Sequence, residues 1–277
     1  MTGCQAINNI FFPEICSSCG EINDGFLCEK CRNSIIEIKK ISCHLCGAPF
    51  VSDKHEFPSN DKSSFLLSDE LFQKSQNPKI NPKLQKICHP KKDYKCCRSC
   101  RDGDYSFHKL RSFGLYTGVL KKLIIKFKYR RIFTLAPVLN GFLKKVYIEN
   151  FADKKIDYVD TVPDFLDFKS SLALPAFYDE NHMKILAELF AAEIGIPYGG
   201  NILKIKKTSK QQNLGEYERK VNLEGAFKAA DMLRAYKKNI LLVDDVWTTG
   251  NTLNQISKAL KNCGAQKIYL LTIARTI

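Results

Sequence analysis

The fold of the C-terminal half is decided by a stretch that runs Ile240-Leu241-Leu242-Val243-Asp244-Asp245-Val246-Trp247-Thr248-Thr249-Gly250-Asn251-Thr252. Its first four residues are apolar, which is typical of a strand buried on both faces of a parallel sheet. We expect this strand to end at the two carboxylates. Leu253, Ile256 and Leu260 then repeat at helical spacing, with Gly264 as the expected C-terminal stop. Lys267–Ala274 reads as the next strand. The pattern predicts a strand–loop–helix–strand unit whose polar loop lies at the carboxyl end of a parallel strand, where open α/β sheets bind ligands.

The polar loop combines the groups that a sugar phosphate needs. Backbone N–H groups that lead into a helix N-terminus form an anion site, and the helix dipole strengthens it. Two adjacent ionised carboxylates suit vicinal sugar hydroxyls, because each accepts more than one hydrogen bond. The alternative is a solvated acidic turn before an ordinary threonine-capped helix.

This stretch resembles the 5-phosphoribosyl-1-diphosphate (PRPP) loop of type I phosphoribosyltransferases. The resemblance implies that Asp244 and Asp245 hold the ribose hydroxyls. It also implies that the 5′-phosphate is held by Thr248, Thr249, Gly250, Asn251 and Thr252.

Length and composition indicate a globular protein with an anionic partner or a highly charged surface. The chain has 277 residues, 44% of them hydrophobic, and a formal net charge of +14. Such an excess suits phosphate-rich ligands or nucleic acid, and solubility alone explains it equally well. No segment approaches the roughly 18 apolar residues of a membrane helix. Met1–Gln5 lacks the basic and apolar regions of a secretory signal, so we expect a cytoplasmic protein without membrane insertion.

Eleven of the twelve cysteines lie in the first 100 residues and include four C-x-x-C pairs. Without an export signal, disulfides explain them poorly, whereas two thiolates spaced in this way fit one edge of a tetrahedral zinc site. We favour two structural Cys4 sites, the first formed by Cys16, Cys19, Cys28 and Cys31 and the second by Cys43, Cys46, Cys97 and Cys100. All four positions of each site are then filled by protein, which indicates a role in folding.

Other ligand sets remain open at this point. The pairs could interleave, first with third and second with fourth. Cys96 could replace Cys97, and Cys88 or His89 could enter the second site. A redox role for the pairs is a further alternative.

The chain divides by composition into two expected domains. Residues 1–106 form a double zinc ribbon, interrupted at about 51–95 by a low-complexity insertion rich in Ser, Asn, Lys and Pro. Residues 107–277 form an α/β domain with a parallel sheet flanked by helices. Its further strands are expected at Arg111–Tyr116, Ile156–Val162 and Asn201–Lys206. Helices are expected at Val119–Arg131, Pro137–Phe151 and Asn181–Ile194.

The helix at 119–131 is basic and amphipathic. Its apolar face carries Leu120, Leu123, Ile124 and Phe127. Positive charge crowds the other side, where the candidate contacts for anions or nucleic acid are Lys126, Lys128, Tyr129 and Arg130. Tyr129 could stack on a base. A solvated helix face is an equally good interpretation.

Taken together, the chain resembles the ComF family of bacterial competence proteins, which join a double zinc ribbon to a type I phosphoribosyltransferase domain. The family's Lys-Tyr-Arg segment appears as Lys128-Tyr129-Arg130. Its Thr-x-x-Gln-x-x-Leu segment appears as Thr208, Gln211 and Leu214, and its Arg-x-x-Asn-x-x-Gly-Ala-Phe segment as Arg219, Asn222 and Gly225-Ala226-Phe227.

One region departs from the family pattern. The family has Val-Pro-Val-Pro and basic residues on the side that holds pyrophosphate, whereas this chain has Val162, Pro163 and Asp164. Asp164 and Asp167 would repel that group. Of the Asn-Gln that follows in the family, Asn181 remains. We expect His182 to be a surface residue at the helix start rather than a catalytic base.

The resemblance implies an enzyme that binds PRPP with Mg²⁺ and transfers phosphoribosyl to a nitrogen nucleophile, with pyrophosphate as the other product. The alternative is a catalytically weak or inactive protein of the same fold that binds single-stranded DNA during natural transformation. Its partners would then be DNA or the competence helicase machinery. The acceptor substrate has no signature in the sequence.

Overall fold

The computed structural model describes residues 14–38, 42–50, 96–163, 181–206 and 223–276. These residues belong to two compact units. One unit is Lys39–Asp104, and the other joins Met1–Ile38 to Tyr105–Ile277. We call the second of these the body. The predicted insertion at 51–95, with Cys88 and His89, lies outside the described residues, as do the motif residues Thr208 to Asn222.

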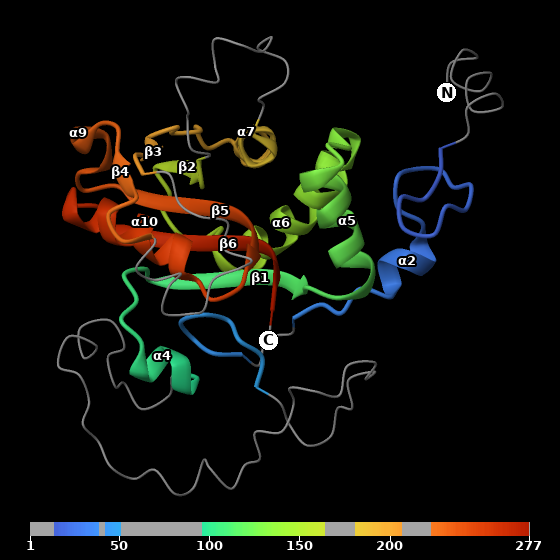
Figure 1. Ribbon diagram of the computed structural model, residues 1–277, viewed down its shortest axis with the longest axis horizontal. Helices are drawn as coiled ribbons and strands as arrows, with labels where there is room; N and C mark the ends of the chain where they lie inside the picture. The colour runs from blue at the N-terminus through green and yellow to red at the C-terminus, as the bar shows by residue number, and fades with distance from the viewer. Residues whose placement is uncertain (1–13, 39–41, 51–95, 164–180, 207–222, 277) are drawn as a thin grey trace, which may run out of the picture. The chain divides into compact units, whose positions relative to one another are not determined.

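The body is built on a four-stranded parallel sheet in the order β1-β6-β5-β2 (Figure 1). The strands are β1 (Lys109–Leu115), β2 (Tyr158–Thr161), β5 (Asn239–Trp247) and β6 (Lys267–Arg275). The predicted end of β5 at Asp244 is wrong: pairing with β6 continues to Trp247 opposite Arg275. The strand continues because Trp247 is itself buried and gives its end an apolar anchor.

Helices cover this sheet with the apolar faces that the sequence predicts. They are α5 (Gly118–Tyr129), α6 (Ala136–Asn150), α7 (His182–Ile194) and α10 (Asn251–Asn262), with a 3-10 turn η2 (Phe133–Leu135) and a short α9 (Met232–Ala235). α6 packs against β1 and β6, and α7 packs against β2. The buried residues of α5 are Leu120, Leu123, Ile124 and Phe127, as expected from their spacing. No helix among the described residues is long and apolar enough to span a lipid bilayer.

A two-stranded antiparallel hairpin of β3 (Ile202–Lys204) and β4 (Phe227–Ala229) lies outside the main sheet. It is tied to the sheet by Asp160, a buried residue of β2. The Asp160 Oδ2 accepts a hydrogen bond from the backbone N–H of Asn201 at 2.8 Å. The Asn201 side chain in turn bonds both the N–H and the C=O of Asp231. This chain of hydrogen bonds fixes the hairpin to the carboxyl half of β2.

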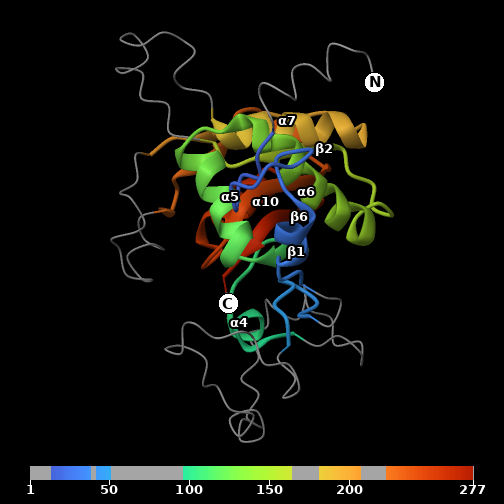
Figure 2. The same ribbon diagram turned by 90° about the vertical axis from the view of Figure 1, so that its right-hand side faces the viewer.

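The first cysteine knuckle, residues 14–38 with the short helix α2 (Glu29–Asn33), shares its hydrophobic core with the body. Leu27, Cys28 and Ile35 belong to the same buried cluster as the inner residues of β1, α5 and α6. Its last residues extend along β1: Leu115 N–H donates to Ile36 O, and Ile38 N–H donates to Phe113 O, both at 2.9 Å. The knuckle lies beside α5 in both views (Figures 1 and 2). It is therefore an integral part of the body.

Candidate functional site

The acidic pair lies near the carboxyl end of β5, as predicted. Asp244 is partly buried, and Asp245 is only 4% exposed. Asp244 Oδ1 accepts a hydrogen bond from the Asp245 N–H at 2.9 Å, and Asp245 Oδ1 accepts one from the Val246 N–H at 2.7 Å. These bonds fix one oxygen of each carboxylate and leave the other to contact a neighbour or a ligand.

Two basic side chains converge on the remaining oxygen of Asp245. Lys128 Nζ lies 2.5 Å from Asp245 Oδ2, and His182 Nε2 lies 3.5 Å from the same atom. Lys128 comes from α5 and His182 from the start of α7, where it also contacts the Phe127 ring edge-on at 5.8 Å. The sequence did not predict this cluster, because its members lie far apart along the chain. The one signal for it was the Lys-Tyr-Arg segment of the resemblance.

The expectation of a surface position for His182 is wrong. Its side chain is 16% exposed, and its Nε2 is buried against Asp245. The preceding residue explains this placement: Asn181 caps α7 by accepting from the Met183 N–H at 2.8 Å, and its Nδ2 donates to Val162 O at 3.3 Å. The cap fixes the first turn of α7 against the end of β2, which turns His182 inward.

The pKa values of the two aspartates are shifted in opposite directions. Burial and the neighbouring Asp245 carboxylate raise the pKa of Asp244 to about 7, although Lys128 partly opposes this. Burial also favours the neutral form of Asp245, but the nearby His182 and the Lys128 charge outweigh it and lower the pKa of Asp245 to about 2. For Lys128, burial is outweighed by the Asp245 and Asp244 carboxylates, which hold its pKa above the ordinary value.

The predicted phosphate loop follows directly, and Gly250 shapes it. Gly250 has φ +75° and is the N-cap of α10. A Cβ at this position would lie 2.0 Å from the Trp247 ring, so any larger residue would clash as well as strain the backbone. The Phe107 ring packs edge-on against the Trp247 ring, with the two centroids 5.6 Å apart. The loop places Thr248 at the surface, with Thr249, Asn251 and Thr252 partly buried.

The candidate contacts on α5 have divided roles. Lys128 is paired with Asp245, and Lys126 Nζ donates to Ser17 O in the first knuckle at 2.5 Å. Tyr129, which is 62% exposed, and Arg130 face solvent at the C-terminal end of the helix. Lys126 and Lys128 are therefore engaged within the body, while Tyr129 and Arg130 are exposed, and contact of any of the four with an anion stays a prediction.

The candidate pyrophosphate side is described only in part. Val162 and Pro163 follow β2 and are partly buried. Val162 O accepts from the Asn181 cap, so this loop lies at the same edge of the sheet as the acidic pair. Asp164 and Asp167 lie outside the described residues.

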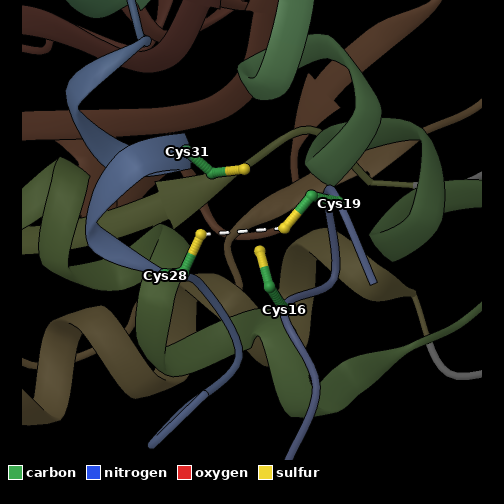
Figure 3. Close-up of side chains that lie close together, drawn as sticks. All are labelled: Cys16, Cys19, Cys28 and Cys31. Carbon is green, nitrogen blue, oxygen red and sulfur yellow. Dashed lines mark hydrogen bonds between the residues drawn. The ribbon is translucent and has the colours of Figure 1, made fainter. Parts of the chain in front are cut away.

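The cysteines form two groups of four. Cys16, Cys19, Cys28 and Cys31 make the first tetrad, and Cys43, Cys46, Cys97 and Cys100 make the second; within each, all four Sγ atoms lie within 4.8 Å of one another. Figure 3 shows the sulfurs of the first tetrad pointing toward a common centre. This is the favoured pairing rather than the interleaved one. Cys97 rather than Cys96 joins the second tetrad, next to the start of α4 (Arg98–Asp102).

Both tetrads fit a structural Zn²⁺. Tetrahedral coordination at about 2.3 Å from zinc places sulfurs about 3.8 Å apart. Cys19 Sγ and Cys28 Sγ lie 3.7 Å apart, as do Cys46 Sγ and Cys97 Sγ. Backbone N–H groups also turn toward the sulfurs: Ser18 N lies 3.5 Å from Cys16 Sγ, and Cys97 N lies 3.3 Å from Cys43 Sγ. Backbone donors of this kind stabilise metal-bound thiolates.

Comparisons with known proteins agree with this geometry. A double zinc ribbon domain model matches residues 7–61, and a phosphoribosyl transferase domain model matches residues 185–276. Competence protein F of Haemophilus influenzae is 29% identical over 187 residues, which cover 65% of this chain and 78% of the relative. The DNA utilization protein YhgH of Salmonella typhimurium is 24% identical over 182 residues, with the same two coverages.

Among solved structures, glutamine PRPP amidotransferase from B. subtilis aligns with a TM-score of 0.36 at 17% identity. The alignment covers 54% of this chain and 30% of that structure. The two domain models follow each other along the chain in the order that the ComF resemblance implied. The chain is a homologue of competence protein F and YhgH, with a double zinc ribbon followed by a phosphoribosyltransferase domain.

Proposed function

We propose that the body binds PRPP with Mg²⁺ at the acidic pair and transfers its phosphoribosyl group to a nitrogen nucleophile, with release of pyrophosphate. One observation carries the proposal: the carboxylates of Asp244 and Asp245 lie near the carboxyl end of β5, a parallel strand that leads through Gly250 directly into the N-terminus of α10. Ribose hydroxyls and a 5′-phosphate are separated by one short linkage in PRPP. The carboxylates and the helix N-terminus supply an acceptor group and an anion site in the same order.

The two carboxylates have different tasks in this proposal. Asp245 is held by Lys128 and His182, so it is a fixed anion that orients its neighbours. Asp244 has no such cation at hydrogen-bond distance among the described residues, and its free oxygen is the acceptor for the ribose 2′- and 3′-hydroxyls. Mg²⁺ is bound mainly by oxygens of the ligand, as expected of an ion that keeps few protein ligands.

Lys128 supplies positive charge near the candidate pyrophosphate side, whose described residues Val162 and Pro163 carry no charge. Its ammonium has three N–H donors, one of which is directed at Asp245, and its side chain is 34% exposed. The other two donors can reach diphosphate oxygens as negative charge develops on the leaving group. Catalysis then rests on positioning and on charge stabilisation rather than on covalent chemistry.

Isothermal titration with Mg²⁺-PRPP tests the ligand assignment. The wild type should release binding heat, and Asp244→Asn/Asp245→Asn should bind at least about tenfold more weakly, because a neutral amide is a poorer acceptor for paired hydroxyls. Asp153→Asn is the matched control, since Asp153 is an exposed aspartate paired with Lys154 and precedes the start of β2, whereas Asp244 lies near the carboxyl end of β5. Equal affinity in all three proteins would refute the assignment. Turnover is tested separately, as PRPP-dependent pyrophosphate release across a panel of nucleobases.

A second candidate function is binding of single-stranded nucleic acid. The supporting observation is a row of lysines where the strands begin, which we call the strand-start lysines: Lys109, Lys154, Lys155, Lys237, Lys238 and Lys267. They precede or begin four neighbouring strands spaced about 4.8 Å apart. Their charge is only partly offset, by Asp153 and Asp157. Burial, together with the charges of Arg111 and Lys154, lowers the pKa of Lys109 to about 8.

An exposed aromatic ring accompanies these lysines. Tyr236 is 52% exposed, and Lys237 Nζ lies 5.1 Å from its ring centroid. Lysines that follow a phosphate backbone next to an aromatic ring available for stacking are typical of single-strand binding surfaces. This edge of the sheet lies opposite the acidic pair, so the two activities would use separate surfaces of the body.

Filter binding of a single-stranded oligonucleotide, measured against salt concentration, tests this second function. Affinity should fall steeply with salt, and Lys238→Glu/Lys267→Glu should weaken it and flatten the salt dependence. The control is Lys121→Glu/Lys122→Glu, which makes the same charge change on the exposed side of α5. A loss confined to the α5 variant would assign binding to the helix instead. Absence of binding at low salt would rule out both surfaces.

A further inference from the structure

Helix α5 connects the first cysteine tetrad to the acidic pair. Lys126 Nζ donates to Ser17 O, and Ser17 lies between the metal ligands Cys16 and Cys19. Two residues further along the helix, Lys128 Nζ contacts Asp245 Oδ2. The same turn of helix therefore contacts the metal-binding loop at Lys126 and the candidate ligand site at Lys128.

The carbonyl that Lys126 contacts is held in place by the fold of the knuckle. Ser17 N–H donates to Phe26 O at 2.8 Å, and Gly20 N–H donates to Cys16 O at 2.9 Å. Residues 14–38 are far fewer than the roughly 40 needed for an independent core, so a segment of this size depends on a bound metal to keep its shape. Loss of the metal would therefore loosen the loop that carries Ser17 O, the acceptor of Lys126.

The knuckle is fixed to the rest of the body by further contacts. A change in the position of the knuckle therefore also shifts the elements that it contacts. Lys145 on α6 pairs with Glu37 at 2.5 Å, and the Arg32 guanidinium lies 5.6 Å from the centroid of the Phe142 ring. A Cβ on Gly114 would lie 2.8 Å from Ile36 O, which shows how closely the knuckle approaches β1. The knuckle contacts α5, α6 and β1 together.

We infer that metal binding at the first tetrad is coupled to the acidic pair through α5, with Lys126 as the positioning residue that transmits the coupling. The bound metal fixes Ser17, Ser17 fixes Lys126, and the helix then holds Lys128 against Asp245. The part of this inference that concerns PRPP rests on the proposed function; the part that concerns Lys128 and Asp245 does not.

Coupling between two sites is reciprocal. If the metal favours the arrangement that binds a ligand at Asp244, the ligand must strengthen metal binding by the same factor. Coupling energies of this kind typically change an affinity by about 5- to 150-fold. The second tetrad belongs to the other compact unit and serves as the internal reference.

The test follows metal release from the full-length, metal-loaded protein. Cd²⁺ replaces Zn²⁺, and ¹¹³Cd resonances distinguish the two tetrads, with Cys43→Ser used for assignment. On addition of a chelator, Lys126→Met should lose metal from the first tetrad at least about fivefold faster than wild type and leave the second unchanged. Lys126→Arg, which keeps a donor, should restore the slow rate. Lys122→Met, on the exposed side of the same helix, is the matched control and should behave as wild type.

Two further readouts separate coupling from a purely local role of Lys126. Hydrogen exchange at the last turn of α5 should accelerate in Lys126→Met and in metal-free protein, whereas exchange in α10 should not. Mg²⁺-PRPP should slow metal release from the first tetrad of the wild type but not of Lys126→Met. Release and exchange in Lys126→Met that match those in Lys122→Met would overturn the inference. If the wild type does not bind PRPP, the proposed function fails, while release and α5 exchange still decide the coupling.

Discussion

Lys128 Nζ on α5 and Asp245 Oδ2 on β5 lie 2.5 Å apart, although 117 positions separate them in the chain. The contact makes the acidic pair asymmetric. Asp245 has a cation of its own, while Asp244 next to it carries the raised pKa. Two adjacent aspartates that look equivalent in the sequence therefore differ in charge state near neutral pH, and their difference is set by a helix from another part of the fold.

The first prediction concerns this ion pair. Lys128→Met should destabilise the body at pH 7 by about 1–2 kcal/mol, less than a fully buried pair would cost because Lys128 is a third exposed. The pKa of Asp245 is about 2 in the folded state, below an unfolded value near 3.9, so its contribution to stability is present above pH ~3.9 and is lost as pH falls through about 2.

Urea unfolding at pH 7 and pH 3 measures this effect. The free energy of unfolding should fall less between pH 7 and pH 3 in Lys128→Met than in wild type, because the variant has no Lys128–Asp245 ion pair for acid to weaken. Lys122→Met should retain the wild-type difference. An unchanged acid dependence in Lys128→Met would show that His182 rather than Lys128 depresses the pKa of Asp245.

The second prediction is a pH dependence of PRPP affinity. The Asp244 carboxyl, with a pKa of about 7, must be ionised to accept two ribose hydroxyls, so affinity should rise as pH increases from about 6 to 8. For folding the sign is reversed: a pKa raised above the unfolded value contributes stability at low pH that is lost as pH rises through about 7.

Titration calorimetry of wild type and Asp244→Asn across this pH range isolates the contribution of Asp244 ionisation to PRPP affinity. Asp244→Asn should bind weakly at every pH and show only the dependence that comes from the ligand's own phosphate groups. Parallel curves for the two proteins would assign the whole pH dependence to PRPP.

The third prediction uses two glycines that both have positive φ. Gly250→Ala adds a Cβ 2.0 Å from the Trp247 ring at φ +75°, so both strain and overpacking should destabilise the body, by about 2–4 kcal/mol in total. Gly118→Ala meets nothing within 4 Å at φ +51° and should cost only the backbone strain, about 1–2 kcal/mol. Chemical denaturation of both variants checks the difference, and equal losses would mean that Trp247 moves aside without cost.

The fourth prediction concerns the approach of the knuckle to β1. Gly114→Ala places a Cβ 2.8 Å from Ile36 O and 2.9 Å from Leu120 Cδ2, which should cost about 1–3 kcal/mol and loosen residues 14–38. Limited proteolysis should then cut within this segment sooner than in wild type. The control is Gly141→Ala, in the open on α6, which should be neutral or stabilising because alanine is the better helix former. Unchanged proteolysis in Gly114→Ala would show that β1 accommodates the methyl group.

Local patterns were enough to predict most elements of the body. Apolar runs located the four parallel strands, and 3.6-residue spacing gave the buried faces of α5 and α10, because both signals are carried by neighbours in sequence. The length of β5 was misjudged because polar residues need not end a strand whose backbone remains paired. The strand β4 (Phe227–Ala229) was not predicted, although the equally short β3 was expected within Asn201–Lys206. The apolar residues of β3 are adjacent, whereas Lys228 separates those of β4.

The candidate site could be predicted only as far as its residues are consecutive. Asp244 to Thr252 form one continuous stretch, so the kind of ligand that they suit could be predicted from the sequence. The partners of Asp245 come from α5 and α7, and nothing in the spacing of Lys128 or His182 indicates which carboxylate each would meet. The docking of the first knuckle was missed for the same reason, because its contacts join residues far apart in the chain, such as Ser17 and Lys126, which are 109 positions apart.

The shared core of the knuckle and the body has a consequence for how the chain is made. Residues 14–38 leave the ribosome first, but Phe113, Leu120 and Phe142, with which they share a buried cluster, are translated only after the whole intervening unit. At about 5–20 residues per second, Phe113 follows Ile38 after about 4–15 s. We expect metal capture to bridge this delay by keeping the nascent knuckle compact. The remainder of the body would then condense on a preformed template, so that metal supply during translation governs the yield of native protein.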